Sequence, residues 1–250
     1  MRSLFRKIRE ANRPFCTALV AAAGSSSRMG GTDKLMEFLD NVPVLMRTLT
    51  ALQRAAAIDE IVIAAREDAL VDISTLCKTY GITKCSKVVR GGESRCHSVL
   101  LAALEASPEA KLLAVQDGAR PLVTPALIDR TVEAAAKCGA AAPAVPVKDT
   151  IKQAKGGNGK TVPEGCMVEN TPDRSTLRAV QTPQVFEADL LKASLQSALE
   201  NEVPVTDDCS AVERLGKVVY LIDGDEENLK ITTPVDLVIA EAILAEREGR

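Results

Sequence analysis

Residues 21–34 combine small side chains with two cations. The stretch AAAGSSSRMGGTDK follows the apolar segment CTALV, and Arg28 and Lys34 stand six residues apart within it. Small side chains let a ligand approach backbone N–H groups closely, and the two cations add positive charge at the same place. This chemistry suits a polyphosphate, although a Gly/Ser-rich loop after a strand is often only a connection.

Two common phosphate-binding patterns are missing from this loop. It contains no Gly-Lys-Ser/Thr of the Walker A type, and Ser26 stands where the middle glycine of G-x-G-x-x-G would be. A nucleotide bound here therefore requires another architecture. A dinucleotide oxidoreductase is disfavoured for the same reason.

Two later polar stretches also follow apolar segments. RGGESRCHS at 90–98 offers two more adjacent glycines, and QDGARP at 116–121 places Asp117 at the end of the apolar run KLLAV. A carboxylate so placed is a natural ligand for Mg²⁺, which takes hard oxygen ligands and shares the oxygens of substrate phosphates. Taken alone, Asp117 is equally suited to capping the turn that follows it.

The elements that must position these residues alternate between strands and helices. Apolar, β-branched segments predict strands at 17–22, 60–65, 87–90, 111–116 and 218–222. Helical periodicity predicts helices at 43–57, 95–106, 125–138, 187–200 and from 234 onwards, and in the first of them Leu45, Leu49, Leu52 and Ala56 share one face. This alternation predicts an α/β fold, with a mostly parallel sheet covered by helices on both faces. Ligands of such sheets bind beyond the carboxyl ends of the strands, where the loop at 21–34 would lie.

The segment at about 147–175 breaks this alternation. Gly156, Gly157, Asn158 and Gly159 are a strong signal for a hairpin turn between two short polar strands. A hairpin with so little apolar content is either a solvated flap or an arm that packs on a partner chain.

Composition limits the remaining possibilities. The chain has 250 residues, 46% of them apolar, which suits one α/β domain over residues 16–250 behind a basic lead-in at 1–15. A net charge of −3 and 2% aromatic residues disfavour nucleic acid, and no apolar run approaches the length of a membrane span. Seven scattered cysteines and one histidine, His97, disfavour a zinc site or a disulfide framework and indicate a cytoplasmic protein.

Seven motifs, taken in order, resemble the 2-C-methyl-D-erythritol 4-phosphate cytidylyltransferases. They are AAAGSSSRM at 21–29, RGGESRCHSV at 90–99, QDGARP at 116–121, PVKDTIK at 146–152, RSTLRAVQTPQVF at 174–186, TDDCSAVE at 206–213 and NLKITTPVDLVIAE at 228–241. The resemblance implies a single Rossmann-like nucleotidyltransferase domain with a protruding β-hairpin arm. It also implies transfer of the cytidylyl group of CTP to 2-C-methyl-D-erythritol 4-phosphate in non-mevalonate isoprenoid biosynthesis, with release of pyrophosphate and with Mg²⁺ or another divalent cation as cofactor.

The resemblance also implies roles for individual residues. Arg28 and Lys34 match the family's catalytic residues, which contact the triphosphate. The positions that match its nucleotide site are Ala22, Ala23, Gly24, Gly92, Ser98 and Asp117, and Asp117 is also the matching metal ligand. The positions that match its acceptor site are Thr150, Arg174, Thr182 and Lys230, with Arg120 and Thr206 as neighbours. The segment at 147–175 matches the family's dimerisation arm, which implies a homodimer whose second subunit supplies some acceptor contacts.

The chain departs from the family at several positions, and one of these departures, together with two alternatives, bears on function. Asp33 stands before Lys34 where the family usually has proline, and its charge is expected to lower the effective charge of the lysine. One alternative is a cytidylyltransferase for ribitol 5-phosphate, which is disfavoured by Ala119 and by QTPQ at 181–184. The other is a nucleotide-binding module without catalysis. Intact cations at both predicted phosphate sites argue against that module.

Overall fold

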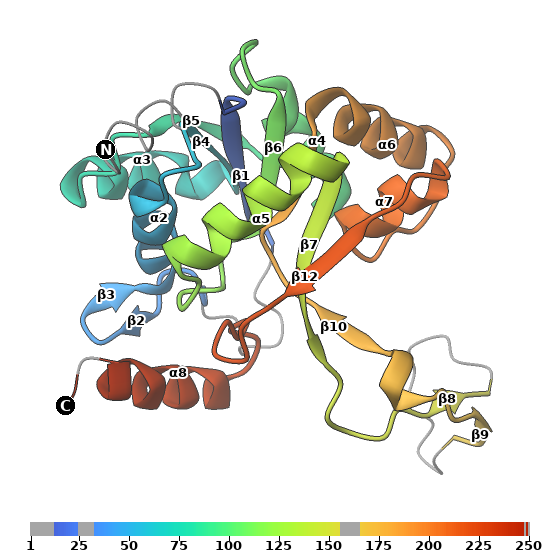
Figure 1. Cartoon of the computed structure of the whole chain (residues 1–250). Helices are drawn as coiled ribbons and strands as arrows, with labels where there is room; N and C mark the ends of the chain where they lie inside the picture. Colours follow the sequence, from blue (N-terminus) through green and yellow to red (C-terminus); the bar gives the residue numbers. More distant parts are fainter. Residues whose placement is uncertain (1–12, 25–32, 156–165, 248, 250) are drawn as a thin grey trace, which may run out of the picture.

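A single mixed β-sheet forms the centre of the protein in the computed structural model, which describes residues 13–24, 33–155, 166–247 and 249 (Figure 1). In spatial order its strands are β10 (Arg178–Val180), β7 (Ala140–Pro146), β11 (Gln184–Glu187), β6 (Leu112–Asp117), β1 (Cys16–Ala22), β4 (Glu60–Ala65) and β5 (Cys85–Arg90), and β12 (Tyr220–Asp223) also pairs with β7. The α/β fold predicted from the sequence is confirmed.

The half of the sheet that carries the predicted nucleotide loop is parallel. β1 runs parallel to both β4 and β6, and β5 runs parallel to β4. The five predicted strands are present within two residues of their expected bounds. β11 was not predicted, and it runs antiparallel between β6 and β7. A four-residue strand leaves too short an alternation to be recognised in the sequence.

Two layers of helices cover the sheet. The covering helices are α2 (Val44–Arg54), α3 (Leu70–Thr79), α4 (Arg95–Leu104), α5 (Pro125–Cys138), α6 (Ala188–Glu200) and α7 (Asp208–Arg214). The last helix, α8 (Pro234–Arg247), lies apart from these layers (Figure 1). Side chains of β1 point alternately to the two layers, because successive residues of a strand face opposite sides. Ala18 and Val20 pack in the same core as α2, α3 and α5, whereas Leu19 packs with α4, α6 and α7.

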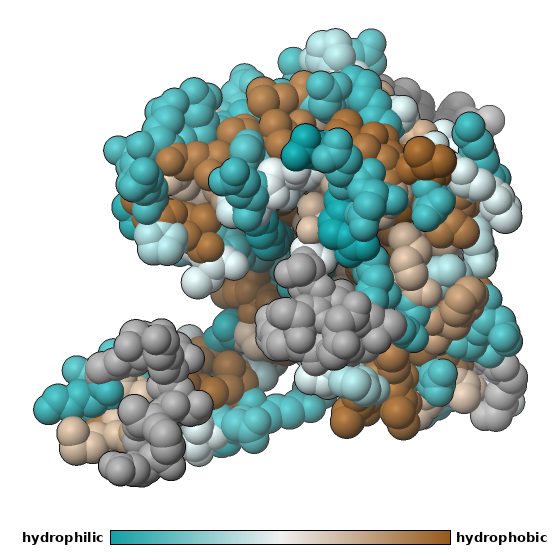
Figure 2. All heavy atoms as spheres, turned by 180° about the vertical axis from the view of Figure 1, so that it is seen from behind, coloured by the Kyte–Doolittle hydropathy of each residue, from teal (hydrophilic) through white to brown (hydrophobic). Residues whose placement is uncertain are grey.

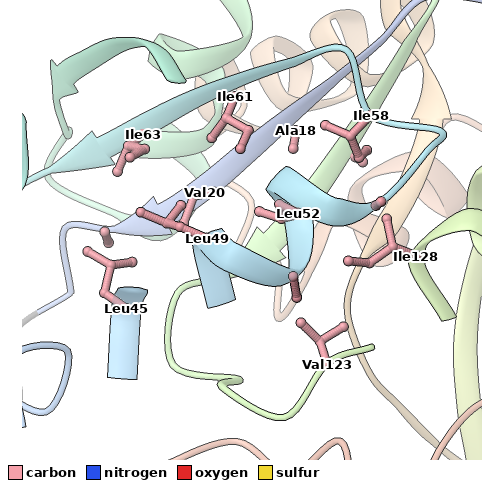
Figure 3. Packing of buried hydrophobic residues seen from close by; sticks show 14 of the residues in the cluster. Ala18, Val20, Leu45, Leu49, Leu52, Ile58, Ile61, Ile63, Val123 and Ile128 are labelled. Carbon is pink, nitrogen blue, oxygen red and sulfur yellow. The ribbon is translucent and has the colours of Figure 1, made fainter. Parts of the chain in front are cut away.

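Helix α2 illustrates how the sequence pattern builds the first core. Leu45, Leu49 and Leu52 are fully buried beside strand residues such as Val20, as the periodicity predicts (Figure 3). The expected extension of this helix to residue 57 is wrong, and Ala56 is exposed beyond its end. The helix stops because Ala55 is in the extended conformation, and its buried methyl group takes the core position instead.

A narrow arm stands away from the body of the protein (Figures 1 and 2). It contains the antiparallel strands β8 (Gln153–Ala154) and β9 (Val168–Asn170) and a 3₁₀ turn, η3 (Arg174–Thr176). The predicted turn at 156–159 and most of the predicted lead-in at 1–15 lie outside the described residues. Smaller features are the hairpin of β2 (Phe38–Leu39) and β3 (Val42–Pro43) and the 3₁₀ turn η2 (Glu67–Ala69). None of the helices in the described ranges has both the length and the apolarity that crossing a membrane requires.

Candidate functional site

A cavity of about 380 Å³ lies at the carboxyl ends of the parallel strands. Its lining includes seven residues that the sequence assigned to the site, namely Ala23, Gly24, Lys34, Gly92, Ser98, Asp117 and Lys230. They come from the loop after β1, the turn before β2, the loop after β5, the first turn of α4, the end of β6 and the segment before α8. Parallel pairing brings them together, because the ends of β1 and β6 are neighbours with Ala21 opposite Asp117.

The loop between β5 and α4 packs too closely for side chains at its two glycines. A Cβ atom at Gly91 would lie 2.3 Å from the Cβ of Ala23, and one at Gly92 would lie 2.3 Å from the ring of His97. The Ser98 hydroxyl accepts a hydrogen bond from the Gly92 N–H at 3.0 Å and so holds this loop against the start of α4. Gly92 therefore lines the cavity with its backbone, at a position that has no room for a side chain.

Asp117 is the negative centre of the site. Its carboxylate lies 2.8 Å from Lys230 Nζ, 3.5 Å from Arg120 Nε and 3.6 Å from Arg95 Nη2, and the residue is 7% exposed. Burial by itself would raise the pKa of Asp117, but Lys230, Arg95 and Arg120 outweigh burial and hold that pKa below its usual value. A carboxylate surrounded by three cations stays ionised at neutral pH.

A second buried carboxylate supports this cluster, and sequence reasoning missed it. Asp208 lies 2.7 Å from Arg95 Nη1, so Arg95 bridges Asp208 and Asp117. Burial raises the pKa of Asp208, and the nearby Arg95 opposes that rise. Arg95 also lines the cavity. Both residues belong to motifs that the sequence singled out, RGGESRCHS and TDDCSAVE, but neither motif shows that the two side chains meet.

Four other predicted residues are not part of the cavity lining. Thr182 accepts a hydrogen bond from the Asp117 N–H at 3.1 Å, and Arg120 pairs with Asp117, so both support the carboxylate. Ala22 is buried at the end of β1. Thr206 is exposed just before Asp207, whose side chain caps α7.

Two of the remaining predicted residues belong to the arm, and the third lies outside the described residues. Thr150 and Arg174 are exposed and belong to the arm that projects away from the sheet (Figure 1). Arg174 donates a hydrogen bond to the Lys148 carbonyl at 2.6 Å within that arm. Arg28 lies outside the described residues.

The fold and the site together define a class of protein. Small residues, loop backbone and cations line one cavity beyond the ends of the parallel strands of an α/β sheet. This arrangement is typical of a site for a phosphorylated nucleotide. Lys34 and Lys230 line the same cavity although 196 positions separate them in the chain. The arrangement is that of a nucleotide-dependent transferase rather than of a dinucleotide oxidoreductase.

Comparisons with known proteins identify the family. The family model described as 2-C-methyl-D-erythritol 4-phosphate cytidylyltransferase matches residues 16–246. The enzyme of that name from Bacillus cytotoxicus is 42% identical over 229 residues, which cover 91% of this chain and 97% of that protein. The one from Dehalococcoides mccartyi is 40% identical over 233 residues, covering 93% of this chain and 96% of that protein.

Solved structures agree with these relatives. The 4-diphosphocytidyl-2C-methyl-D-erythritol synthase from Anaerococcus prevotii superposes with a TM-score of 0.78 at 30% identity, covering 92% of this chain and 98% of that one. The 2-C-methyl-D-erythritol 4-phosphate cytidylyltransferase from Thermus thermophilus gives 0.72 at 30% identity with the same two coverages. The chain belongs to the 2-C-methyl-D-erythritol 4-phosphate cytidylyltransferase family, a family of the non-mevalonate isoprenoid pathway. The family and the activity predicted from the sequence are thereby confirmed.

Proposed function

We propose that the cavity at the ends of β1 and β6 is where the chain joins the cytidylyl group of CTP to 2-C-methyl-D-erythritol 4-phosphate. The observation that carries this assignment is that Lys34, predicted for the nucleotide, and Lys230, predicted for the acceptor, line one cavity. A transferase must bring two phosphorylated substrates into one space. A module that only bound a nucleotide would need no second cation for an acceptor phosphate.

The residues suit a displacement at the α-phosphorus of CTP. An oxygen of the acceptor phosphate forms the new bond to that phosphorus, the bond to the β-phosphate oxygen breaks, and the electron pair leaves with pyrophosphate. Negative charge grows on the oxygens around the reacting phosphorus, and a preorganised cation stabilises it more in a partly enclosed site than in water. Lys34 suits stabilisation of the triphosphate, while Gly24 and Gly92 add no side chain to the cavity wall and so leave room for the nucleotide.

Asp117 fits the role of a Mg²⁺ ligand that is shared with the nucleotide. Mg²⁺ is usually held by one or two carboxylates together with substrate phosphates, and Asp117 lines the same cavity as Lys34. Within the described ranges, no three His, Cys, Asp or Glu side chains gather closely enough to hold a metal by themselves. The ion, when bound, supplies charge neutralisation at the phosphates. Lys230, Arg95 and Arg120 keep the carboxylate ionised and oriented for it.

The arm supports a homodimer with shared acceptor sites. Its apolar side chains are exposed in the single chain, with exposed fractions of 41% for Ile151, 69% for Met167 and 57% for Val168. Such a thin hairpin gains stability by packing on a second copy. Pairing of two copies would place Thr150 and Arg174 of one subunit at the acceptor site of the other.

We also propose that the protein acts in the cytoplasm. All seven cysteines are free thiols in the structure, and Cys16, Cys77, Cys96 and Cys209 are buried among core side chains. Free structural thiols are typical of a reducing compartment.

The activity assay measures pyrophosphate release with Mg²⁺, each of CTP, UTP, ATP and GTP, and either 2-C-methyl-D-erythritol 4-phosphate or ribitol 5-phosphate. We expect release with CTP and the methylerythritol acceptor only. Release with ribitol 5-phosphate instead would show that this compound is the acceptor. No pyrophosphate in any combination would support the nucleotide-binding module without catalysis.

Lys34→Ala is expected to lower kcat by about 100-fold or more while the circular dichroism spectrum stays unchanged. Comparable activity in Lys34→Ala and wild type would show that Lys34 does not stabilise the reacting triphosphate.

Mixing the Lys34→Ala and Arg174→Ala variants tests the shared site, at an acceptor concentration well below the wild-type KM, where both variants are strongly impaired. If the acceptor contacts come from the partner subunit, a Lys34→Ala subunit paired with an Arg174→Ala subunit contains one complete site. Random pairing of equal amounts then restores about a quarter of the wild-type sites, because half of the dimers are mixed and each has one intact site. No recovery after mixing, with dimers confirmed by light scattering, would place both residues in the same subunit's site.

A further inference from the structure

Asp33, which directly precedes Lys34, forms an ion pair with Arg66. Asp33 Oδ2 and Arg66 Nη2 lie 2.9 Å apart, and the two side chains are 22% and 33% exposed. Arg66 is the first residue after β4, and the last pair of residues in the β1–β4 ladder is Ala22 and Ala65. The ion pair therefore ties the backbone next to Lys34 to the end of the strand beside the nucleotide loop.

A second contact of Asp33 shapes the turn that carries Lys34. Asp33 Oδ1 accepts a hydrogen bond from the Leu35 N–H at 3.1 Å, and the Asp33 carbonyl accepts one from the Met36 N–H at 2.9 Å. Leu35 is 4% exposed, and its carbonyl accepts a hydrogen bond from the Leu45 N–H at 3.0 Å. Lys34 thus lies between a residue held to β4 by an ion pair and a residue held in the core.

Placement of the backbone matters for a lysine that must meet a reacting phosphate. Its ammonium group is carried on a flexible four-carbon stem, so the direction in which the backbone presents that stem limits the positions the charge can reach. A displacement of about 1 Å in a catalytic group is enough to lower a rate by about 100-fold. The contacts of Asp33 fix the backbone on the N-terminal side of Lys34, where small displacements carry directly into the cavity.

We propose that Asp33 and Arg66 are positioning residues for Lys34. Their ion pair holds the turn at 33–36 against the end of β4 and so keeps the lysine directed at the nucleotide phosphates. The proposal rests on the role of Lys34 proposed above. It differs from the simpler expectation that Asp33 weakens the charge of its neighbour, because the two ideas predict opposite effects when the carboxylate is neutralised.

Steady-state kinetics separate these ideas. If the pair positions Lys34, Asp33→Asn and Arg66→Gln each lower kcat by about tenfold and change the KM for CTP less than about threefold. Arg66→Lys keeps the charge and restores most of the rate. Asp68→Asn is the matched control, since Asp68 is the other partner of Arg66 at 3.1 Å but its side chain is 76% exposed. We expect wild-type kinetics from it.

A double-variant cycle with Lys34 distinguishes positioning from general damage. Arg66→Gln should add nothing to the loss of kcat in Lys34→Ala, because the group that it positions is already gone. CTP affinity by calorimetry, without acceptor, provides a second measurement and should be equal in Lys34→Ala with and without Arg66→Gln.

Three results would overturn the proposal. The first is a rise in kcat for Asp33→Asn. The second is a loss of kcat in Asp68→Asn equal to the loss in Asp33→Asn. The third is that Arg66→Gln and Lys34→Ala lower kcat and the CTP affinity independently of each other. Full activity in Lys34→Ala would instead refute the role of Lys34 itself, so the two failures are distinguishable.

Discussion

Replacing Asp117 by asparagine should destabilise the protein as well as inactivate it. The substitution keeps the size of the side chain but removes the negative charge at the centre of three cations. Lys230, Arg120 and Arg95 approach the carboxylate to 2.8, 3.5 and 3.6 Å. After the change these cations repel one another, and among the described residues only Arg95 keeps a carboxylate partner close by, Asp208 at 2.7 Å.

The magnitude follows from these distances and from burial. At an effective dielectric constant of about 20, each contact is worth about 5 kcal/mol of direct attraction. Desolvation of the buried carboxylate and repulsion among the cations offset most of this attraction. Lys230 is also 38% exposed, so water screens its share. We therefore expect a loss of about 2–4 kcal/mol in the free energy of unfolding, near the lower end of the values for breaking a buried ion pair.

Urea unfolding at neutral pH measures this loss directly. Glu105→Gln is the matched control, because the Lys87–Glu105 pair has the same separation of 2.8 Å but side chains that are 48% and 50% exposed. It should cost less than about 1 kcal/mol. Adding Lys230→Met to Asp117→Asn should recover part of the stability by removing one unpaired cation. Unfolding of Asp117→Asn at the wild-type urea midpoint would refute this account of the cluster.

The same cluster predicts how the difference depends on pH. The three cations hold the folded-state pKa of Asp117 below its ordinary value, so folding favours the ionised carboxylate. The stability it contributes is fully present above the unfolded-state pKa of about 4 and is lost as the pH falls through the lower folded-state pKa. The gap between wild type and Asp117→Asn should therefore stay constant from about pH 5 to 7 and narrow below about pH 4.

Two further substitutions test the nucleotide loop and the arm. Gly91→Ala should lower the unfolding midpoint and raise the KM for CTP, because its Cβ would lie 2.3 Å from that of Ala23. Gly24→Ala should leave the midpoint unchanged, because its Cβ would meet none of the described residues within 4 Å. Equal midpoints for the two variants would contradict the packing of this loop. Arg174→Ala should raise the KM for the acceptor about tenfold or more with little change in the KM for CTP, whereas Arg178→Ala, which removes an exposed cation at the start of β10, should not. An equal rise in the KM for the acceptor in both variants would indicate that positive charge in this region matters, rather than a specific contact of Arg174.

Local sequence determined the parallel part of this fold. Strands β1, β4, β5 and β6 and helices α2, α4, α5 and α6 are each long enough to show the periodicity of a strand or a helix. Their alternation implies a parallel sheet, which in turn implies a site at the carboxyl ends of the strands. The small residues and cations at 21–34 indicated a phosphate, and the resemblance of ordered motifs indicated the reaction.

Tertiary structure decided which charges meet. β11 is too short for its own sequence to specify a strand, and its antiparallel hydrogen bonds to β6 and β7 stabilise it in the sheet. Arg95 meets Asp208 across 113 positions of the chain, and Arg66 meets Asp33 across 33. Nothing local marks either pair, because the energy of an ion pair depends on distance and burial, and both quantities exist only after the elements have packed.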